Sequence, residues 1–404
     1  MRRPPREIKS GLHAIPPLAV NIIALALRTR CPMPGLRWIL FGWCLAVFAL
    51  TVRAESPEIV RIGFAAPLTG PQAHYGRDSE NGARLAIEEL NAGDPRIGGR
   101  AVRFELVAED DQASPTTGTI AAQRLVDRDI RGMAGHFNSG VTIPASRIYH
   151  DAGIPQLSVS TNVTYTRQGY RTAFRVMAAD DRQGAALGRY AVERLGLKRF
   201  AVVDDRSAYG QGIADAFAAA VTAGGGQVVR REFAAEKDVD FRALLTTLRG
   251  ANPDAIFFGG YDVQAGPMAR QMRELGMTPL LLGGETLHTA KFIELAGTAA
   301  EGHLASTPGA ALERRPGGRT FADRYRQRFG QEPGLYAPYV YDSVMTIAAA
   351  MQKAGSAAPA KYLPALRADH HPGVTADIAF DADGNLVDAP LSIFRVSGGK
   401  WVLQ

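Results

Sequence analysis

The chain has 404 residues, of which 46% are hydrophobic and 21% charged. This composition is typical of a globular protein and excludes a largely disordered one, and the length favours two domains. The formal net charge of +6 comes from residues 1–54, which hold eight of the 46 basic and one of the 40 acidic residues, so that 38 and 39 remain for residues 55–404. The basic balance is therefore no argument for nucleic-acid binding, and we expect no nucleic-acid partner.

Residues 1–54 are predicted to be a leader with a secretory signal peptide. Twelve apolar residues at 39–50 follow Arg37, and the stretch after them is typical of a cleavage site that ends at Ala54. Met33 stands where such a signal peptide would begin and is the expected true start. The alternative is an uncleaved N-terminal anchor.

After the leader, apolar strand patterns alternate with amphipathic helix patterns in two series. The first series predicts strands at 59–68, 102–108, 132–137 and 155–160, and helices at 79–91, 115–128 and 141–152. The second series predicts strands at 200–204, 228–233, 255–260 and 280–283, and helices at 182–195, 212–223, 241–249 and 265–275. This order predicts an α/β protein with two doubly wound, mostly parallel sheets, each covered on both faces.

The part of the chain after residue 308 shows no third series of this kind. It predicts helices at 319–329, 339–353 and 360–368 and strands at 378–380, 391–396 and 401–403. We expect this tail to complete the two lobes.

Sequence signatures of enzymes are missing, and we expect neither an enzyme nor a cofactor. Gly210 and Gly212 follow a predicted strand, but Asp215 occupies the third glycine position of a dinucleotide fingerprint. Both cysteines lie in the leader, so residues 55–404 have no thiol nucleophile, disulfide or cysteine zinc site. The acidic runs 109–111 and 204–205 could hold a metal but are read as caps and turns, and no metal is expected. The pair His370-His371 is expected in an exposed loop.

Hydroxyl side chains follow two strands of the first series. Ser139 comes after the strand at 132–137 and close to the start of a helix, and Thr161 comes after the strand at 155–160. Ligands of open α/β sheets bind beyond the carboxyl ends of the strands, and a helix N-terminus favours an anion. The two hydroxyls could therefore hold a carboxylate. Alternatively, Ser139 caps its own helix and Thr161 closes a turn.

The second series places other polar groups at its strand ends. Tyr209 follows the strand at 200–204, Tyr261 follows 255–260, and Glu285 follows 280–283. A carboxylate facing hydroxyl groups complements an α-amino acid, which carries one cation and one anion. The alternative role for Glu285 is to stabilise the start of a short helix beside Thr286.

From about Ile59 to the C-terminus the chain resembles the periplasmic binding proteins for leucine, isoleucine and valine that supply ABC transporters. The matching stretches are Ile62-Gly-Phe-Ala-Ala-Pro-Leu-Thr-Gly70, Tyr75-Gly76, Gly82-Ala-x-x-Ala-Ile87, Glu89-Leu-Asn91, Gly135-His-Phe-Asn-Ser139, Pro144-Ala-Ser-x-Ile-Tyr149, Tyr209-Gly-x-Gly212, Lys237-Asp-x-Asp-Phe241 and Gly259-Gly-Tyr261. Family members can carry a disulfide at the positions of Ala113 and Asn138, and neither is cysteine here. The loop after Ser139 reads Gly140-Val141-Thr142 where the family has a serine run.

The resemblance implies a type I periplasmic binding fold with a three-segment hinge. Lobe 1 would comprise residues 55–179 and 309–387, and lobe 2 residues 180–308 and 388–404. Ser139 and Thr161 would hold the ligand carboxylate, with a possible shift of one residue at Thr161, and Glu285 and Tyr261 would engage the ammonium. The pocket walls would be Tyr75, Tyr209, Phe137 and Tyr336.

The expected function is capture of a small amino acid, branched-chain aliphatic by first choice, and its delivery to the membrane permease of an ABC transporter. The protein would be a periplasmic monomer. The alternative is a ligand-sensing module of the same fold that binds an amide, urea or an aromatic acid and reports to a receptor or regulator.

Overall fold

The computed structural model describes residues 56–315 and 317–404. The predicted signal peptide and its cleavage site lie outside these residues. The chain divides into the units Met1–Ser56 and Pro57–Gln404, and all that follows concerns the second unit.

The first sheet has six strands in the order β2-β3-β1-β4-β5-β6, and every pair is parallel except β2 with β3. Its strands are β1 (Glu58–Ala66), β2 (Arg96–Ile97), β3 (Arg100–Asp110), β4 (Gly132–Gly135), β5 (Gln156–Ser158) and β6 (Ala173–Arg175). The helices along this part of the chain are α3 (Ala73–Ala92), α4 (Pro115–Asp127), α5 (Ser139–Asp151) and α6 (Thr164–Arg167).

Both faces of the first sheet are covered, as the alternation of buried side chains along β1 shows. Ile62 and Phe64 belong to a core that includes side chains of α3 and of α13 (Ala337–Ala354). Ala65 belongs to a separate cluster with α4 and α5. Helices on both faces of a parallel sheet make the doubly wound arrangement that the sequence predicts.

The second sheet has seven strands in the order β15-β14-β11-β10-β9-β7-β8. Its strands are β7 (Arg199–Asp204), β8 (Gln227–Phe233), β9 (Ala255–Gly259), β10 (Leu280–Gly283), β11 (Leu304–Thr307), β14 (Ser392–Ser397) and β15 (Lys400–Leu403). The strands from β7 to β11 pair in parallel, and the C-terminal hairpin β14–β15 adds two antiparallel strands beside β11. Its helical segments are α7 (Asp180–Arg189), the π-helical turn η1 (Tyr190–Arg194), α8 (Ala208–Ala223), α9 (Arg242–Gly250), α10 (Asp262–Glu274), η2 (Glu285–Leu287), α11 (Ala290–Ala296) and η3 (Gly297–Ala300).

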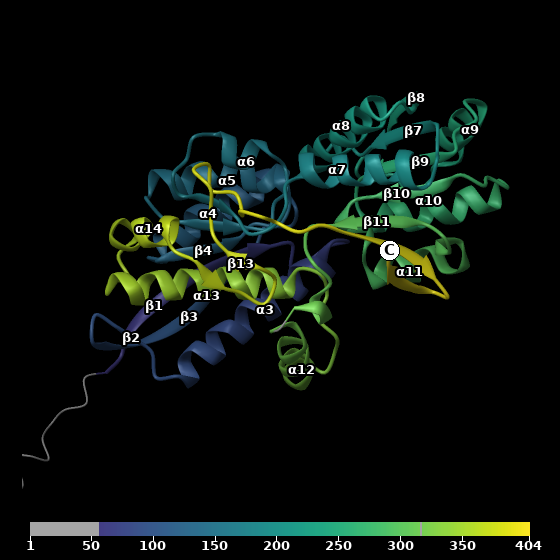
Figure 1. The fold of residues 1–404 in the computed structure, drawn as a ribbon. Coiled ribbons are helices and arrows are strands. Elements are labelled where there is room, and N and C mark those ends of the chain that lie inside the picture. The colour runs from purple at the N-terminus through teal and green to yellow at the C-terminus, as the bar shows by residue number, and fades with distance from the viewer. Residues whose placement is uncertain (1–55, 316) are drawn as a thin grey trace, which may run out of the picture. The chain divides into compact units, whose positions relative to one another are not determined.

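Three connections join the two groups of elements. The chain passes from β6 to α7, returns after β11 to α13, and passes again to β14. Helix α13 packs against α3 of the first group (Figure 1). The fold class is therefore confirmed, while the lobe boundaries at 179, 308 and 388 stay predictions. The remaining elements are η4 (Leu312–Arg314), α12 (Gly318–Phe329), α14 (Pro359–Ala368), β12 (His371–Pro372) and β13 (Asp377–Ile378).

Several predicted elements were incomplete. The helix expected at 182–195 ends as α7 at Arg189 and continues as the π-helical turn η1. Strands β6 and β11 and helix α11 were not predicted, because they are too short to show a clear period. The exposed loop expected at His370-His371 is wrong for His371, which is half-buried and pairs with Ile378 in a two-residue strand.

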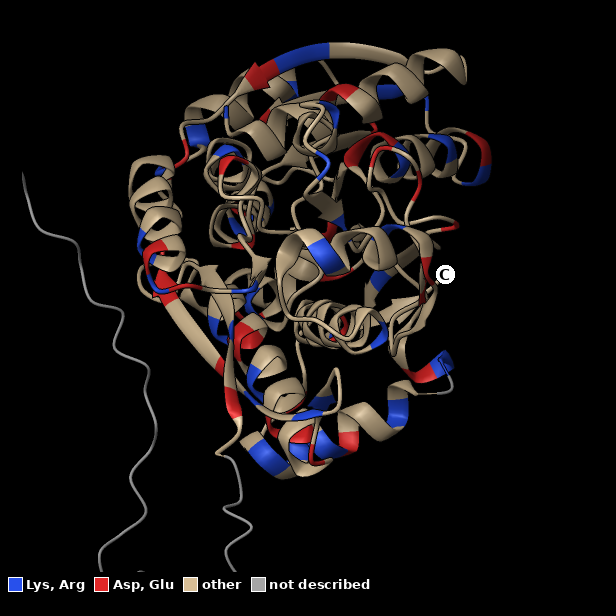
Figure 2. Cartoon of the chain, turned by 90° about the vertical axis from the view of Figure 1, so that its left-hand side faces the viewer, with Lys and Arg blue, Asp and Glu red and all other residues tan. Residues whose placement is uncertain are grey.

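Basic and acidic residues alternate along the helices, as the blue and red segments of the ribbon in Figure 2 show. This distribution fits the near balance of acidic and basic residues at positions 55–404. Among the helices at 56–315 and 317–404, none combines the length and apolarity that crossing a bilayer requires.

Candidate functional site

Residues from both sheets line one small cavity of about 10 Å³ between the side chains. The lining residues are Phe137, Ser139, Val159, Thr161, Tyr209, Tyr261, Glu285, Thr286 and Tyr336. Except for Tyr336, which begins α13, they follow the carboxyl ends of β4, β5, β7, β9 and β10. Parallel strands bring such residues to the same edge of a sheet, where open α/β proteins bind ligands.

The hydroxyl of Ser139 faces the turn after β5. Its Oγ accepts hydrogen bonds from the Ser160 hydroxyl at 3.0 Å and from the Asn162 N–H at 3.3 Å. Ser139 is the first residue of α5, while Asn138 occupies the N-cap and makes no side-chain capping bond. The alternative that Ser139 caps its own helix therefore does not describe this arrangement. Its hydroxyl instead joins two strand ends at a helix N-terminus, where partial positive charge collects.

Glu285 supplies the carboxylate of the cavity. Oε1 accepts a hydrogen bond from the Thr161 hydroxyl at 3.3 Å, and Oε2 accepts one from the Tyr209 hydroxyl at 3.1 Å. Burial raises the pKa of Glu285 to about 7, although these hydrogen bonds act in the opposite direction. An incoming cation would hold this carboxyl group in its charged form.

Thr161 and Ser139 were expected to act together on one carboxylate, but the structure separates their hydrogen bonds. Ser160 contacts Ser139, whereas the hydroxyl of Thr161 turns to Glu285. The structure thus gives Thr161 a contact across the cavity, and its role towards a ligand carboxylate stays a prediction.

The aromatic residues pack in one continuous group, of which Phe137, Tyr209, Tyr261 and Tyr336 line the cavity and Tyr75, expected in its wall, does not. Tyr75 stacks on Phe137 with ring centroids 4.9 Å apart, and Tyr336 meets Phe137 edge-on at 4.7 Å. The rings of Tyr209 and Tyr261, which follow strands of the second sheet, have their centroids 5.5 Å apart. The hydroxyl of Tyr336 is buried and has no hydrogen-bond partner among the described residues.

Sequence reasoning missed Asp180, the first residue of α7. Its carboxylate is buried, and neither oxygen has a hydrogen-bond partner within residues 56–315 and 317–404. Burial and the negative charge of Glu285 raise its pKa well above the usual range. In the sequence, Asp180-Asp181 looks like an ordinary acidic helix start. Only the tertiary structure shows that the first of these acids is buried near Glu285.

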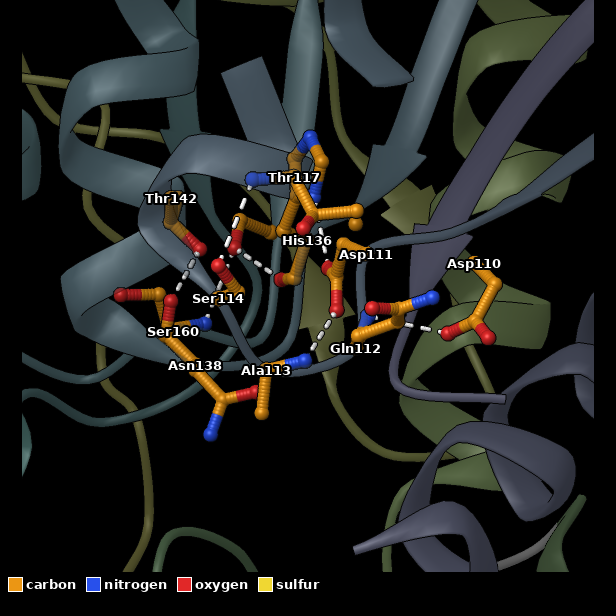
Figure 3. Close-up of polar contacts among 12 residues, drawn as sticks. Asp110, Asp111, Gln112, Ala113, Ser114, Thr117, His136, Asn138, Thr142 and Ser160 are labelled. Atoms are coloured by element: carbon orange, nitrogen blue, oxygen red, sulfur yellow. Dashed lines mark hydrogen bonds and ion pairs between the residues drawn. The ribbon is translucent and has the colours of Figure 1, made fainter. Parts of the chain in front are cut away.

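A buried hydrogen bond between His136 and Asp111 fixes the backbone just before Ser139. His136 Nδ1 lies 2.7 Å from Asp111 Oδ2, and both side chains are inaccessible to solvent (Figure 3). Asp111 also accepts the Ala113 N–H, and Asn138 accepts the Thr142 hydroxyl at its carbonyl, so the loop after β3 and the start of α5 are held together (Figure 3). The acidic runs at strand ends act as turn formers, and the described part of the chain contains no group of three potential metal ligands.

Several contacts bridge the two groups of elements around the cavity. Tyr75 donates to the Thr286 carbonyl at 2.7 Å, and Asn138 donates to the Tyr261 hydroxyl at 2.9 Å. Outside the lining residues, His74 Nε2 lies 2.8 Å from Asp262 Oδ2. The two lobes therefore meet directly around the site.

The family model described as periplasmic binding protein matches residues 59–400. The chain belongs to the periplasmic binding protein family. Members of this family bind solutes and are not enzymes. The chain is therefore a solute-binding protein and not an enzyme.

Two relatives of this periplasmic binding protein come from Pseudomonas aeruginosa. The chain is 31% identical over 353 residues to the leucine-, isoleucine-, valine-, threonine- and alanine-binding protein, covering 87% of this chain and 93% of the relative. It is 36% identical over 346 residues to an amino acid binding protein, covering 84% and 90%.

Solved structures of similar proteins give the same assignment. The leucine binding protein LivK of Thermotoga maritima has a TM-score of 0.79 and 30% identity, covering 85% of this chain and 97% of that one. The branched-chain substrate-binding protein LivJ of Streptococcus pneumoniae, in complex with isoleucine, has a TM-score of 0.78 and 28% identity, covering 86% and 100%. A benzoate complex from R. palustris has a TM-score of 0.77 at 22% identity, which shows the shared fold alone.

Proposed function

We propose that this periplasmic binding protein captures a small α-amino acid, in the first place a branched-chain aliphatic one, and delivers it to the permease of an ABC transporter. The observation that carries the proposal is the pairing, in one buried cavity, of the Glu285 carboxylate with the hydroxyl cluster around Ser139. An α-amino acid needs a cation acceptor and an anion donor within one small space. The relatives named for leucine, isoleucine and valine support the same ligand class.

The proposed contacts follow from the chemistry of each group. The ligand carboxylate would lie at the start of α5 and accept hydrogen bonds from Ser139 and from the turn at Thr161. The ammonium would lie against Glu285 with Tyr261 beside it. Thr161 would exchange its bond to Glu285 for a bond to the ligand.

The ligand side chain would fill the space between the aromatic rings. Tyr75, Phe137 and Tyr336 are buried and approach one another through their faces and edges, and buried Tyr209 packs against Tyr261. Such walls favour an aliphatic side chain through burial of apolar surface.

The cellular setting belongs to the same proposal. The protein would be secreted to the periplasm by a signal peptide cleaved after Ala54 and act as a monomer. Lobe 1 would comprise residues 55–179 and 309–387, and lobe 2 residues 180–308 and 388–404. The two lobes would close on the ligand by hinge motion and present their rims to the permease.

A thermal-shift screen of the purified protein, unfolded and refolded to remove bound ligand, tests the proposal. The ligands are the twenty amino acids, their amides and a set of small aromatic acids. A ligand at about 100 times its Kd stabilises the folded state by roughly 2.7 kcal/mol. For lobes of this size the melting temperature should rise by about 2–4 °C per kcal/mol.

The outcomes separate the two candidate functions. A shift with leucine, isoleucine or valine that is lost in Glu285→Gln supports amino acid capture. A shift only with acids or amides that lack an ammonium would discard the role of Glu285 and favour the sensing alternative. Acids and amides are included in the screen because Glu285, with a pKa of about 7, can also donate a hydrogen bond as a neutral acid.

A further inference from the structure

Arg175, the last residue of the edge strand β6, is a charged residue with no exposed surface. Within the described residues no carboxylate oxygen lies within 4.0 Å of its guanidinium nitrogens. Fully buried arginines are rare unless they are paired with an acid. The charge of buried Asp180 acts on Arg175 from beyond this distance, so the guanidinium itself is held by other contacts.

The guanidinium donates only to neutral acceptors. Nη1 donates to the carbonyl oxygens of Ser160 at 2.8 Å and of Asn162 at 2.9 Å. Nη2 donates to the Thr166 hydroxyl at 2.9 Å, and Nε donates to the Asn385 side-chain oxygen at 3.2 Å. Burial lowers the pKa of Arg175 only to about 10, so the group carries its charge at neutral pH.

The two carbonyl acceptors flank Thr161. The Ser160 carbonyl shares a peptide unit with the Thr161 N–H, so a charged donor on the oxygen polarises that unit and makes its N–H a stronger donor. Thr161 is buried, and its N–H makes no hydrogen bond with any other residue that the structure describes. A buried, unpaired and polarised N–H beside the Ser139 hydroxyl suits a ligand carboxylate.

A second set of bonds fixes the backbone of Arg175 and the side chains that accept from its guanidinium. The Arg175 N–H donates to the Gly384 carbonyl at 2.8 Å, and the Thr166 hydroxyl donates to the Asn385 side-chain oxygen at 2.8 Å. The segment around residues 384–385 therefore holds the side chain in place. The guanidinium cannot turn away from the Ser160–Asn162 turn without breaking its own bonds to Thr166 and Asn385.

We infer that Arg175 is a positioning residue for ligand binding, which holds and polarises the turn from Ser160 to Asn162 so that this turn binds the carboxylate of the ligand. The inference rests on the proposed function and adds the origin of its anion selectivity. Arg175 touches no ligand itself. It supplies a fixed positive charge behind the peptide groups that do.

The test compares leucine with leucinamide, which keeps the ammonium and lacks the negative carboxylate. Their dissociation constants are measured by calorimetry for the unaltered protein and for Arg175→Met, with circular dichroism and melting temperature as checks of folding. The matched control is Arg167→Met, which removes an exposed arginine of α6 that pairs with Asp181. Arg175→Met should weaken leucine binding by at least about tenfold and leucinamide binding far less, so the preference for leucine collapses. Arg167→Met should leave both constants unchanged.

A second variant covers the case in which Arg175→Met does not fold. Arg175→Lys keeps the charge but loses the paired donors, so it should bind leucine more weakly and still prefer it over leucinamide. Equal weakening of both ligands in either folded variant would overturn the inference and make Arg175 a general structural residue. Failure of both variants to fold would overturn it in the same way. If the unaltered protein did not bind leucine, that result would instead contradict the proposed function.

Discussion

The hydroxyl of Thr161 donates a hydrogen bond to Glu285 across the cavity, over 3.3 Å. The two residues follow β5 of one sheet and β10 of the other, so the bond links the two lobes at the site itself. In this structure the groups proposed to bind an amino acid thus satisfy one another. A ligand must offer both groups a better partner, and an ammonium beside a buried carboxylate does so through a charge-assisted bond.

Glu285→Ala should abolish amino acid binding and leave the fold intact. Removing the carboxylate takes away the only charged partner proposed for the ligand ammonium, and we expect the affinity to fall by at least about 100-fold. The melting temperature without ligand should stay equal or rise, because the raised pKa shows that burying this carboxyl group in charged form is unfavourable. Calorimetry against leucine measures the effect, with Glu294→Ala, an exposed acid, as the control. Unchanged affinity would remove Glu285 from the site.

Ser139→Ala should weaken binding by about 1–3 kcal/mol through loss of a hydrogen bond to a charged group. The control is Ser146→Ala in the same helix, whose hydroxyl donates to the Ile143 carbonyl. Titration calorimetry of both variants with leucine separates the two positions. A lower melting temperature with unchanged affinity in Ser139→Ala would show that this hydroxyl serves stability alone.

The polar residues at strand ends could be predicted because the β-α-β pattern fixes which end of each strand faces the ligand edge. Ser139, Tyr261 and Glu285 follow directly from the ends of β4, β9 and β10 in this way. The register at Thr161 could not be derived, since the irregular turn after β5 has no period. There the hydrogen bonds of Ser160 and Thr161 decide which hydroxyl faces which partner.

Asp180 and Arg175 escaped prediction for a different reason. An aspartate at a helix start and a lone arginine normally lie in solvent, so residue type favours exposed positions for both. Arg175 is buried here against Asn385, which lies 210 residues later in the chain, and Asp180 is buried near Glu285. Burial by segments distant in sequence is a tertiary property, and it leaves no periodic signal in the chain.

The affinity for an amino acid should fall as the pH drops below about 7. In the ligand-free protein burial raises the pKa of Glu285 to about 7, and ammonium binding requires the ionised form, so ligand uptake releases a proton. The loss should approach about tenfold per pH unit while Glu285 remains ionised in the complex. Calorimetry from about pH 5 to about pH 8, in two buffers with different ionisation enthalpies, counts the released protons. An affinity independent of pH would contradict this linkage.

The stability of the ligand-free protein should change with pH in the opposite sense. The native state binds more protons than the unfolded state between the usual pKa of 4.5 and the raised value of about 7, so the free energy of unfolding should fall as the pH rises through this window. Burial raises the pKa of Asp180 as well and adds to the same trend. Urea unfolding at several pH values gives the free energy of unfolding of the unaltered protein and of Glu285→Gln. The difference between the two proteins in the slope of this free energy against pH measures the contribution of Glu285.

His74→Ala should weaken ligand binding without altering the cavity. Asp262 Oδ2, which is inaccessible to solvent, accepts from the Thr289 hydroxyl at 2.7 Å and lies 2.8 Å from His74 Nε2. The contact joins α3 of one lobe to α10 of the other, so its loss favours separation of the lobes and lowers the population able to hold a ligand.

For such a half-exposed pair we expect a loss of about two- to fivefold in affinity, mainly as faster dissociation. Stopped-flow release of leucine measures it, and Arg328→Ala, which removes an exposed ion pair with Glu88 away from the lining residues, is the control. An equal change in the dissociation rate of both variants would show that the effect comes from the altered net charge of the protein and not from the contact between the lobes. An unchanged dissociation rate in His74→Ala would show that this contact does not hold the lobes together.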